Sequence, residues 1–222
     1  MTILFDLDGT LIDTAPDFIA AVNQLRTQRG LSPLPSALQL AVRLAVTDGI
    51  KAITQAGFEL MPEEDAALSQ QLLETYQQNL GISAKPFPGI EALLSLLDVH
   101  QIQWGIVTNK QARFTEPLLE RLGLIHRAAC IVSGDTTAYA KPHPAPLLHA
   151  CTQMTVLPKQ CIYIGDAKQD ILAGQAAGMT TVVALFGYIR DPALAREWGA
   201  HHYVSHPDEI FPWFKKWSEV LQ

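Results

Sequence analysis

The chain has 222 residues, of which 48% are hydrophobic and 17% charged, as is typical of a globular protein with a sizeable core. Its net charge of −6 argues against a nucleic-acid partner, which would require a basic surface. We recognise neither a signal sequence nor an apolar run of membrane-spanning length, and we therefore expect a cytoplasmic protein without a membrane partner. The three cysteines, Cys130, Cys151 and Cys161, form no CxxC pair, so we expect buried thiols rather than a disulfide or zinc site.

The chain opens with a short apolar run that ends in two carboxylates, Asp6 and Asp8, followed by Gly9 and Thr10. This pattern predicts a buried strand that delivers both acids into a loop, because residues two apart along a strand point the same way. Carboxylates this close repel each other unless a cation or proton lies between them, and magnesium prefers oxygen ligands. The alternative is that these residues form only a polar turn.

Only helices are predicted in the segment that follows. Residues 14–30 read as a first helix with a threonine cap and a glycine stop. Residues 36–57 predict one or two short helices interrupted near residue 49, and the acidic run 62–65 predicts the start of a longer helix. Because residues 15–83 contain no predicted strand, we expect a separate helical unit inserted immediately after the first strand.

From residue 84 onward, predicted strands and helices alternate. Strands are expected at residues 102–107, 129–132, 161–164 and 180–185, with a weak one at 203–204. Helices are expected at residues 90–97, 114–122, 145–153 and 167–178, and again near 192–198 and from 207. Such alternation is typical of right-handed crossovers in a parallel sheet. We therefore predict an α/β fold: a doubly wound, mostly parallel, Rossmann-like sheet formed by residues 1–14 and 84–222, with residues 15–83 as an inserted helical cap domain.

Polar residues follow four of these predicted strands. They are Asp6, Asp8 and Thr10 after the first strand, Thr108 and Asn109 after residues 102–107, Lys141 after residues 129–132, and Asp166 and Asp170 after residues 161–164. In such a sheet the ligand site lies beyond the carboxyl ends of the strands. A hydroxyl and amides at a helix start suit a phosphoryl oxygen, and Lys141 can neutralise negative charge. Asp166 can join Asp6 and Asp8 around a cation.

Four motifs occur in the order known from one enzyme family: DLDGT (6–10), VTN (107–109), KPHP (141–144) and GDxxxD (165–170). Over essentially its whole length the chain resembles the haloacid dehalogenase-like phosphatases that carry a helical cap after the first strand. The resemblance implies a magnesium-dependent phosphomonoesterase with a small phosphorylated metabolite as its partner. We expect a monomer or a homodimer.

The resemblance also implies a role for the acids. Asp6 attacks phosphorus and becomes an aspartyl-phosphate, while Asp8 protonates the leaving alcohol and then deprotonates water. Magnesium is held by Asp6, by the Asp8 carbonyl and by Asp166. A sugar-phosphate mutase would share these residues, because it differs only in whether water or a second hydroxyl accepts the phosphoryl group.

The remaining motif residues have supporting roles by the same resemblance. Thr108, Asn109 and Lys141 stabilise the charge on the transferring phosphoryl group. Asp170 orients Lys141 or a metal-bound water, although it could simply be an exposed helix acid. Thr10 supports the site or acts only as a turn residue.

Shorter stretches of the sequence indicate which substrate to expect. Residues 12–18 resemble the phosphoglycolate phosphatases, whereas residues 104–110, 113–117, 186–189 and 197–200 resemble the N-acetylmuramic acid 6-phosphate phosphatases. The sugar phosphate is favoured, with phosphoglycolate as the alternative. Both compounds carry a carboxylate beside the phosphate. Two cations of the helical unit, Arg43 and Lys51, are expected to bind it, unless they are merely solvated.

Overall fold

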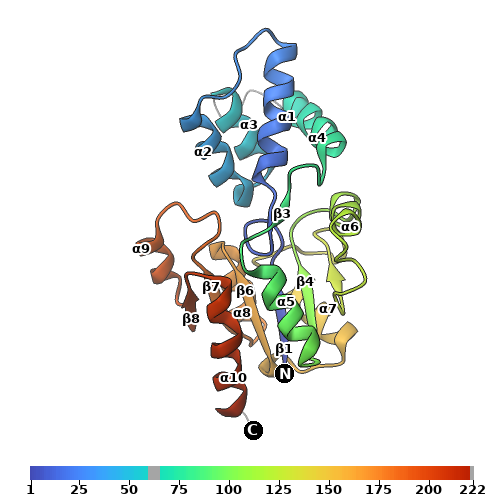
Figure 1. Ribbon diagram of the computed structural model, residues 1–222, viewed down its shortest axis with the longest axis vertical. Coiled ribbons are helices and arrows are strands. Elements are labelled where there is room, and N and C mark those ends of the chain that lie inside the picture. The colour runs from blue at the N-terminus through green and yellow to red at the C-terminus, as the bar shows by residue number, and fades with distance from the viewer. Residues whose placement is uncertain (60–65, 221–222) are drawn as a thin grey trace. The chain divides into compact units, whose positions relative to one another are not determined.

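The computed structural model describes residues 1–59 and 66–220, which divide into two compact units (Figure 1). The core unit comprises Met1–Ile12 and Pro86–Gln222, and the helical unit comprises Asp13–Lys85. The two segments that connect them contain β2 (Ile12–Asp13) and β3 (Lys85–Pro86), which form a two-stranded sheet of their own. No helix among the described residues combines the length and the apolar character needed to cross a membrane.

The core unit is built on a six-stranded sheet in the order β5-β4-β1-β6-β7-β8, and all its neighbouring strands are parallel. The strands are β1 (Thr2–Phe5), β4 (Trp104–Val107), β5 (Ile131–Val132), β6 (Cys161–Gly165), β7 (Thr180–Ala184) and β8 (His202–Val204). The first strand therefore lies inside the sheet, between β4 and β6. This arrangement confirms the predicted doubly wound parallel fold.

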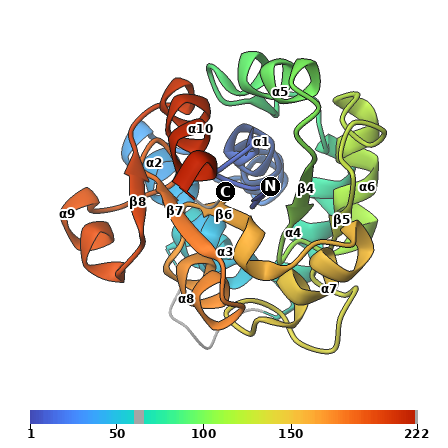
Figure 2. The ribbon, with the colours of Figure 1, turned by 90° about the horizontal axis from the view of Figure 1, so that it is seen from below.

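Helices connect the strands and cover the sheet. They are α5 (Ile90–Val99), α6 (Ala112–Arg121), α7 (Ala145–Met154), α8 (Lys168–Ala176), α9 (Pro192–Ala195) and α10 (Ile210–Val220), with 3₁₀ turns at Pro158–Gln160, Arg196–Trp198 and Pro207–Glu209. Figure 2 shows α5 and α10 on one face and α7 and α8 on the other. Because both faces are covered, β1, β4 and β6 are buried along their whole length, which explains why they are apolar runs without alternation.

Two details of the core unit bear on the sequence-based expectations. The strand predicted at residues 129–132 is shorter than expected, because β5 lies at the edge of the sheet and pairs only with β4. The cysteines are buried and free, as expected, and the Sγ atoms of Cys151 and Cys161 lie 3.8 Å apart.

The helical unit contains α1 (Ala15–Gln28), α2 (Ser36–Ala45), a 3₁₀ turn (Val46–Asp48), α3 (Ile50–Phe58) and α4 (Ala66–Asn79). The break before α3 is as predicted, and Gly49 there has a φ of 89°, which favours glycine. The helix start predicted at residues 62–65 lies outside the described residues. In the interior of the unit, Phe18 of α1 stacks on Tyr76 of α4 with ring centroids 3.8 Å apart.

A buried carboxylate connects the first helix of the helical unit to the segment after its last helix. Asp17, in the first turn of α1, is 1% exposed. It accepts hydrogen bonds from the backbone N–H groups of Gly81 (2.6 Å), Ser83 (2.7 Å) and Ala84 (3.1 Å). One side chain therefore fastens the segment that follows α4 to the start of α1.

We expect Asp17→Ala to lower the free energy of unfolding of the helical unit by about 3 kcal/mol, because three backbone N–H groups, of which that of Ala84 is buried, lose a charged acceptor. Urea unfolding followed by circular dichroism measures the change. The control is Glu74→Ala, which removes an exposed carboxylate of α4 bound to Gln70 and should change stability by about 0.5 kcal/mol or less. Equal effects of the two substitutions would contradict the prediction.

Candidate active site

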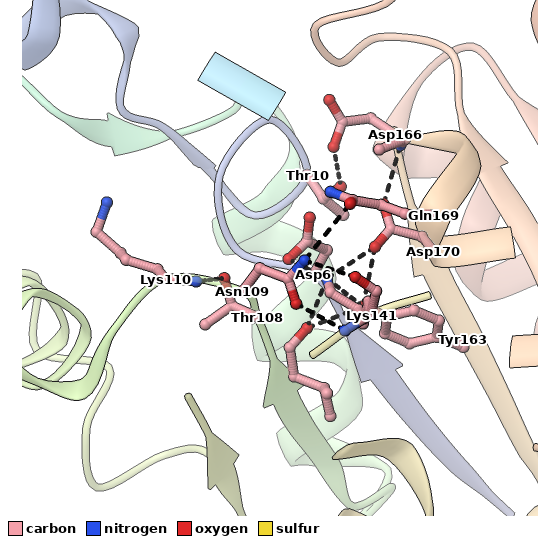
Figure 3. A network of polar contacts seen from close by, with 12 residues as sticks. Asp6, Thr10, Thr108, Asn109, Lys110, Lys141, Tyr163, Asp166, Gln169 and Asp170 are labelled. Atoms are coloured by element: carbon pink, nitrogen blue, oxygen red, sulfur yellow. Dashed lines mark hydrogen bonds and ion pairs between the residues drawn. The ribbon is translucent and has the colours of Figure 1, made fainter. Parts of the chain in front are cut away.

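The sheet order brings the predicted motif residues together. Because β1 lies between β4 and β6, the residues that follow these three strands meet at the edge formed by their carboxyl ends. Asp6 follows β1, Thr108 follows β4 and Asp166 follows β6. Lys141 comes from the segment between β5 and α7. Figure 3 shows these side chains converging on one polar network.

The centre of this network is the ammonium group of Lys141, whose side chain is 1% exposed. Its Nζ lies 2.8 Å from Asp6 Oδ1 and 2.7 Å from Asp170 Oδ1. Burial alone would lower the pKa of Lys141, but the adjacent carboxylates of Asp170 and Asp6 raise it above its ordinary value. The group therefore stays positively charged between the two acids.

The carboxylates around Lys141 carry more negative charge than it neutralises. Burial, and then repulsion from Asp170, raise the pKa of Asp6 to about 7, although Lys141 opposes the shift. Burial and repulsion from Asp6 and Asp170 likewise raise the pKa of Asp166 well above its ordinary range. One ammonium cannot offset three ionised acids, so a further cation would stabilise the charged form of the cluster.

A divalent metal ion fits the donors present. Asp6, Asp166 and Asp170 are all buried, and one carboxylate oxygen from each lies within 4.8 Å of the others. These are hard oxygen donors of the kind that magnesium prefers. In the fully ionised cluster, the three negative charges exceed the single positive charge of Lys141 by two, which a divalent cation would balance.

Asp166 is held by the turn that follows β1 and by the segment that follows β7. Its Oδ1 accepts a hydrogen bond from the Thr10 hydroxyl at 2.9 Å, and its Oδ2 accepts one from the Tyr188 backbone N–H at 2.9 Å. Gly9 has a φ of 84°, and a β-carbon at that position would collide with the Asp166 carboxylate and the Tyr188 ring. The glycine is therefore required both by the turn and by the close approach of Asp166.

The Asp8 side chain contacts a residue that the sequence did not identify as part of the site. Lys110 Nζ lies 3.0 Å from Asp8 Oδ1, and the Lys110 side chain is 5% exposed. Lys110 directly follows the VTN motif at the end of β4. This position, directly after the motif, is the sequence feature that could have identified Lys110 as a site residue.

The residues after β4 have different surroundings. Thr108 is buried, and its Oγ1 accepts a hydrogen bond from the Lys110 backbone N–H at 3.1 Å. The side-chain amide of Asn109 binds both backbone groups of Lys141, donating to its carbonyl oxygen at 3.0 Å and accepting from its N–H at 2.9 Å. The Asn109 side chain thus supports Lys141, which leaves the Asn109 main chain for the predicted phosphate contact.

Asp170, which is expected to orient Lys141 or a metal-bound water, contacts Lys141. It lies on the first turn of α8, where its Oδ2 accepts a hydrogen bond from the Ala167 backbone N–H at 2.9 Å. Its Oδ1 binds Lys141. The side chain is fully buried, so Asp170 is not an exposed helix acid.

The two predicted cations of the helical unit have unlike surroundings. Arg43 Nη1 lies 2.7 Å from Asp13 Oδ1 and 2.8 Å from Asp13 Oδ2, and both side chains are partly exposed. Lys51 is exposed near the start of α3. The described core unit therefore brings together the motif residues, whereas Arg43 and Lys51 belong to the other unit.

Comparison with known proteins gives concordant results. The model of the haloacid dehalogenase-like hydrolase family matches residues 3–184. An N-acetylmuramic acid 6-phosphate phosphatase from Pseudomonas aeruginosa is 40% identical over 210 residues, covering 94% of this chain and 92% of the relative. A phosphoglycolate phosphatase from Xanthomonas campestris pv. campestris is also 40% identical over 210 residues, covering 94% of each chain. The crystal structure of a predicted phosphoglycolate phosphatase from Haemophilus somnus superposes with a TM-score of 0.79 at 24% identity, covering 100% of this chain and 97% of that one, and thus shares the fold.

Proposed function

The chain belongs to the haloacid dehalogenase-like hydrolases, and from that premise we propose that it is a magnesium-dependent phosphomonoesterase that acts through an aspartyl-phosphate. The observation that carries the proposal is the buried contact of Lys141 with Asp6 and Asp170, beside Asp166, at the carboxyl ends of parallel strands. This arrangement holds a carboxylate nucleophile next to a fixed cation, which suits attack on a phosphate ester.

In the proposed reaction, a carboxylate oxygen of Asp6 forms a bond to phosphorus as the bond from phosphorus to the ester oxygen breaks. Asp8 gives a proton to the departing alcohol oxygen. Asp8 then takes a proton from water, which attacks phosphorus and releases inorganic phosphate and the Asp6 carboxylate. Asp8 therefore enters the reaction in its protonated form and becomes the carboxylate that accepts the proton of water. The contact between Asp8 and Lys110 holds the Asp8 side chain in a defined position.

The other residues stabilise charge during the transfer. We assign to Thr108, the Asn109 main chain and Lys141 the stabilisation of the charge on the oxygens of the phosphoryl group. The carboxylates of Asp6 and Asp166, with the Asp8 carbonyl, would hold the magnesium ion. When bound, this ion supplies Lewis-acid stabilisation of the phosphoryl oxygens. Thr10 and the Tyr188 backbone keep Asp166 in place for it.

The experiment that tests this function is phosphate release by the purified protein. With magnesium and N-acetylmuramic acid 6-phosphate as the only phosphate ester, we expect one inorganic phosphate per substrate consumed. The more distant alternative, a sugar-phosphate mutase, would retain the phosphoryl group on sugar and would need a bisphosphate intermediate. Isomerised sugar phosphate without free phosphate would therefore reject the phosphatase.

For the substrate we favour N-acetylmuramic acid 6-phosphate and keep phosphoglycolate as the second candidate. Relatives that carry either name are equally similar to this chain, at 40% identity. The sequence tracts at residues 104–110, 113–117, 186–189 and 197–200 favour the sugar phosphate. We assign recognition of the leaving group to the helical unit, through Arg43 and Lys51, because both substrates present a carboxylate to a cation.

We expect kcat/KM to be higher for N-acetylmuramic acid 6-phosphate than for phosphoglycolate. Lys51→Ala and Arg43→Ala should each raise KM by about tenfold, which corresponds to the loss of one charge-assisted contact of about 1.4 kcal/mol. Steady-state kinetics with both substrates measures these effects. Arg43→Ala also removes the ion pair with Asp13, so the effect of Arg43→Ala on KM should be at least as large as that of Lys51→Ala.

The matched control is Arg29→Ala, which removes a cation of the same unit that contacts Gln71 and the Phe58 ring. Its KM for both substrates should stay within about twofold of the wild-type value. A preference for phosphoglycolate would reject the sugar assignment. Unchanged KM values in both Lys51→Ala and Arg43→Ala would reject carboxylate recognition by these two residues.

A further inference from the structure

The position of the Lys141 ammonium is determined by more than its two carboxylate partners. An ammonium group has three N–H donors and no acceptor. Besides Asp6 Oδ1 and Asp170 Oδ1, Nζ has the hydroxyl of Tyr163 at 2.8 Å and the carbonyl oxygen of Val107 at 3.1 Å (Figure 3). The shortest three contacts, at 2.7–2.8 Å, match the three donors.

The Tyr163 hydroxyl is itself oriented. It donates its single proton to the Val107 carbonyl oxygen at 2.8 Å, and it lies farther, at 3.3 Å, from Asp170 Oδ1. With its proton directed to Val107, its oxygen presents a lone pair to Lys141 Nζ. The phenol therefore bridges the end of β4 and the ammonium group, and its place on β6 fixes that bridge within the sheet.

Packing alone does not require this hydroxyl. Tyr163 is fully buried among apolar side chains that include Leu4, Leu147 and Ala173. A phenylalanine would fill the same space. A buried tyrosine hydroxyl has to be hydrogen-bonded, and here one of its partners is the Lys141 ammonium at the centre of the polar network. The hydroxyl is thus the part of Tyr163 that acts on the site.

On the basis of the proposed function, we infer that Tyr163 is a positioning residue, which holds the Lys141 ammonium against Asp6 while the phosphoryl group is transferred. The backbone of Lys141 is held separately by the Asn109 side chain. Lys141 is thus fixed at both ends, its main chain by Asn109 and its charged end by Tyr163 and the two carboxylates. A transition state is stabilised by charges that need no reorganisation, so loosening one end should slow the chemical step.

The test variant is Tyr163→Phe, which removes only the hydroxyl. We expect kcat for N-acetylmuramic acid 6-phosphate to fall by about tenfold to a hundredfold, while KM stays within about twofold, because the group acts on the transition state. The melting temperature of the variant is measured alongside. Tyr76→Phe is the matched control, since it removes a phenol hydroxyl from an equally buried tyrosine of the helical unit, and it should leave kcat within about twofold.

A second readout does not depend on turnover. In protein labelled with ¹⁵N at lysine Nζ, a buried, fully hydrogen-bonded ammonium exchanges slowly with water and gives a distinct NMR signal, which Lys141→Met assigns by its loss. We expect Tyr163→Phe to shift this signal and accelerate its exchange.

An unchanged ammonium signal would overturn the inference, whatever the activity. A changed signal with kcat within twofold of wild type would also overturn it, as would a fall in kcat matched by a rise in KM. If the wild-type chain released no phosphate, the proposed function would fail, and the NMR signal would still decide whether Tyr163 holds Lys141.

Discussion

Asp6→Asn should lower kcat by about 10⁴-fold or more, because an amide oxygen cannot take the place of the attacking carboxylate. The substitution should not destabilise the fold. The pKa of Asp6 is raised to about 7 by burial and by repulsion from Asp170, so the neutral side chain is the better tolerated form at this position. We therefore expect a melting temperature equal to or above that of the wild-type protein. Steady-state kinetics and thermal unfolding measure the two quantities.

The covalent step can be observed directly. Rapid quenching of the wild-type enzyme with ³²P-labelled substrate should leave label on the protein that hydroxylamine removes, as expected of an aspartyl-phosphate, and Asp6→Asn should carry none. Asp98→Asn is the control, because it makes the same change at a partly exposed carboxylate paired with Arg127, where the effect on activity should be negligible. More than a few per cent of wild-type activity in pure Asp6→Asn would exclude Asp6 as the nucleophile.

Removal of magnesium should lower activity by about a hundredfold or more, with recovery on its return, because the ion provides charge stabilisation that the residues alone lack. Calcium should inhibit, since it accepts more ligands in looser geometry. Asp166→Asn should show the same loss in full magnesium. Activity assays after chelation and re-addition measure these effects.

Magnesium binding should also be detectable as a change in the melting temperature. At the proposed site the ion would bind only the folded cluster and relieve the repulsion between Asp6, Asp166 and Asp170, so it should raise the melting temperature of the wild-type protein. Asp166→Asn should be more stable than wild type without metal and should gain little from magnesium. The Asp98→Asn control should respond as the wild type does. Full activity in metal-free buffer, or an equal magnesium response in Asp166→Asn, would contradict the proposed metal site.

Most of the fold follows from local patterns in the sequence. Apolar runs bounded by turns predict β1, β4, β6 and β7, and periodic apolar positions predict the helices between them. Elements of two residues, β2 and β3, were missed, because a segment so short has no recognisable period. The edge strand β5 was predicted too long, because the sequence does not show which strand has a neighbour on only one side.

The identity of the candidate site residues is also local information. A carboxylate pair, a hydroxyl, a lysine and a further acid each follow a strand, and parallel strands bring such positions to one edge. The sequence by itself therefore determined which motif residues follow the strands at this edge and, through the order of its motifs, the family. Asp6 and Asp166 are recognisable because each directly follows an apolar strand, and Lys141 because it begins the KPHP motif.

Only the tertiary structure decided how these side chains are paired. Lys141 could have met any of several acids, and its contacts with Asp6 and Asp170 depend on the parallel order of β4, β1 and β6. Tyr163 reads in sequence as one more buried strand residue, and its hydroxyl acquires a role because β6 carries it to the end of β4. Likewise, the pairing of Lys110 with Asp8 joins residues 102 positions apart. Pattern and propensity are properties of neighbours along the chain, whereas hydrogen-bond partners are set by packing between elements distant in sequence.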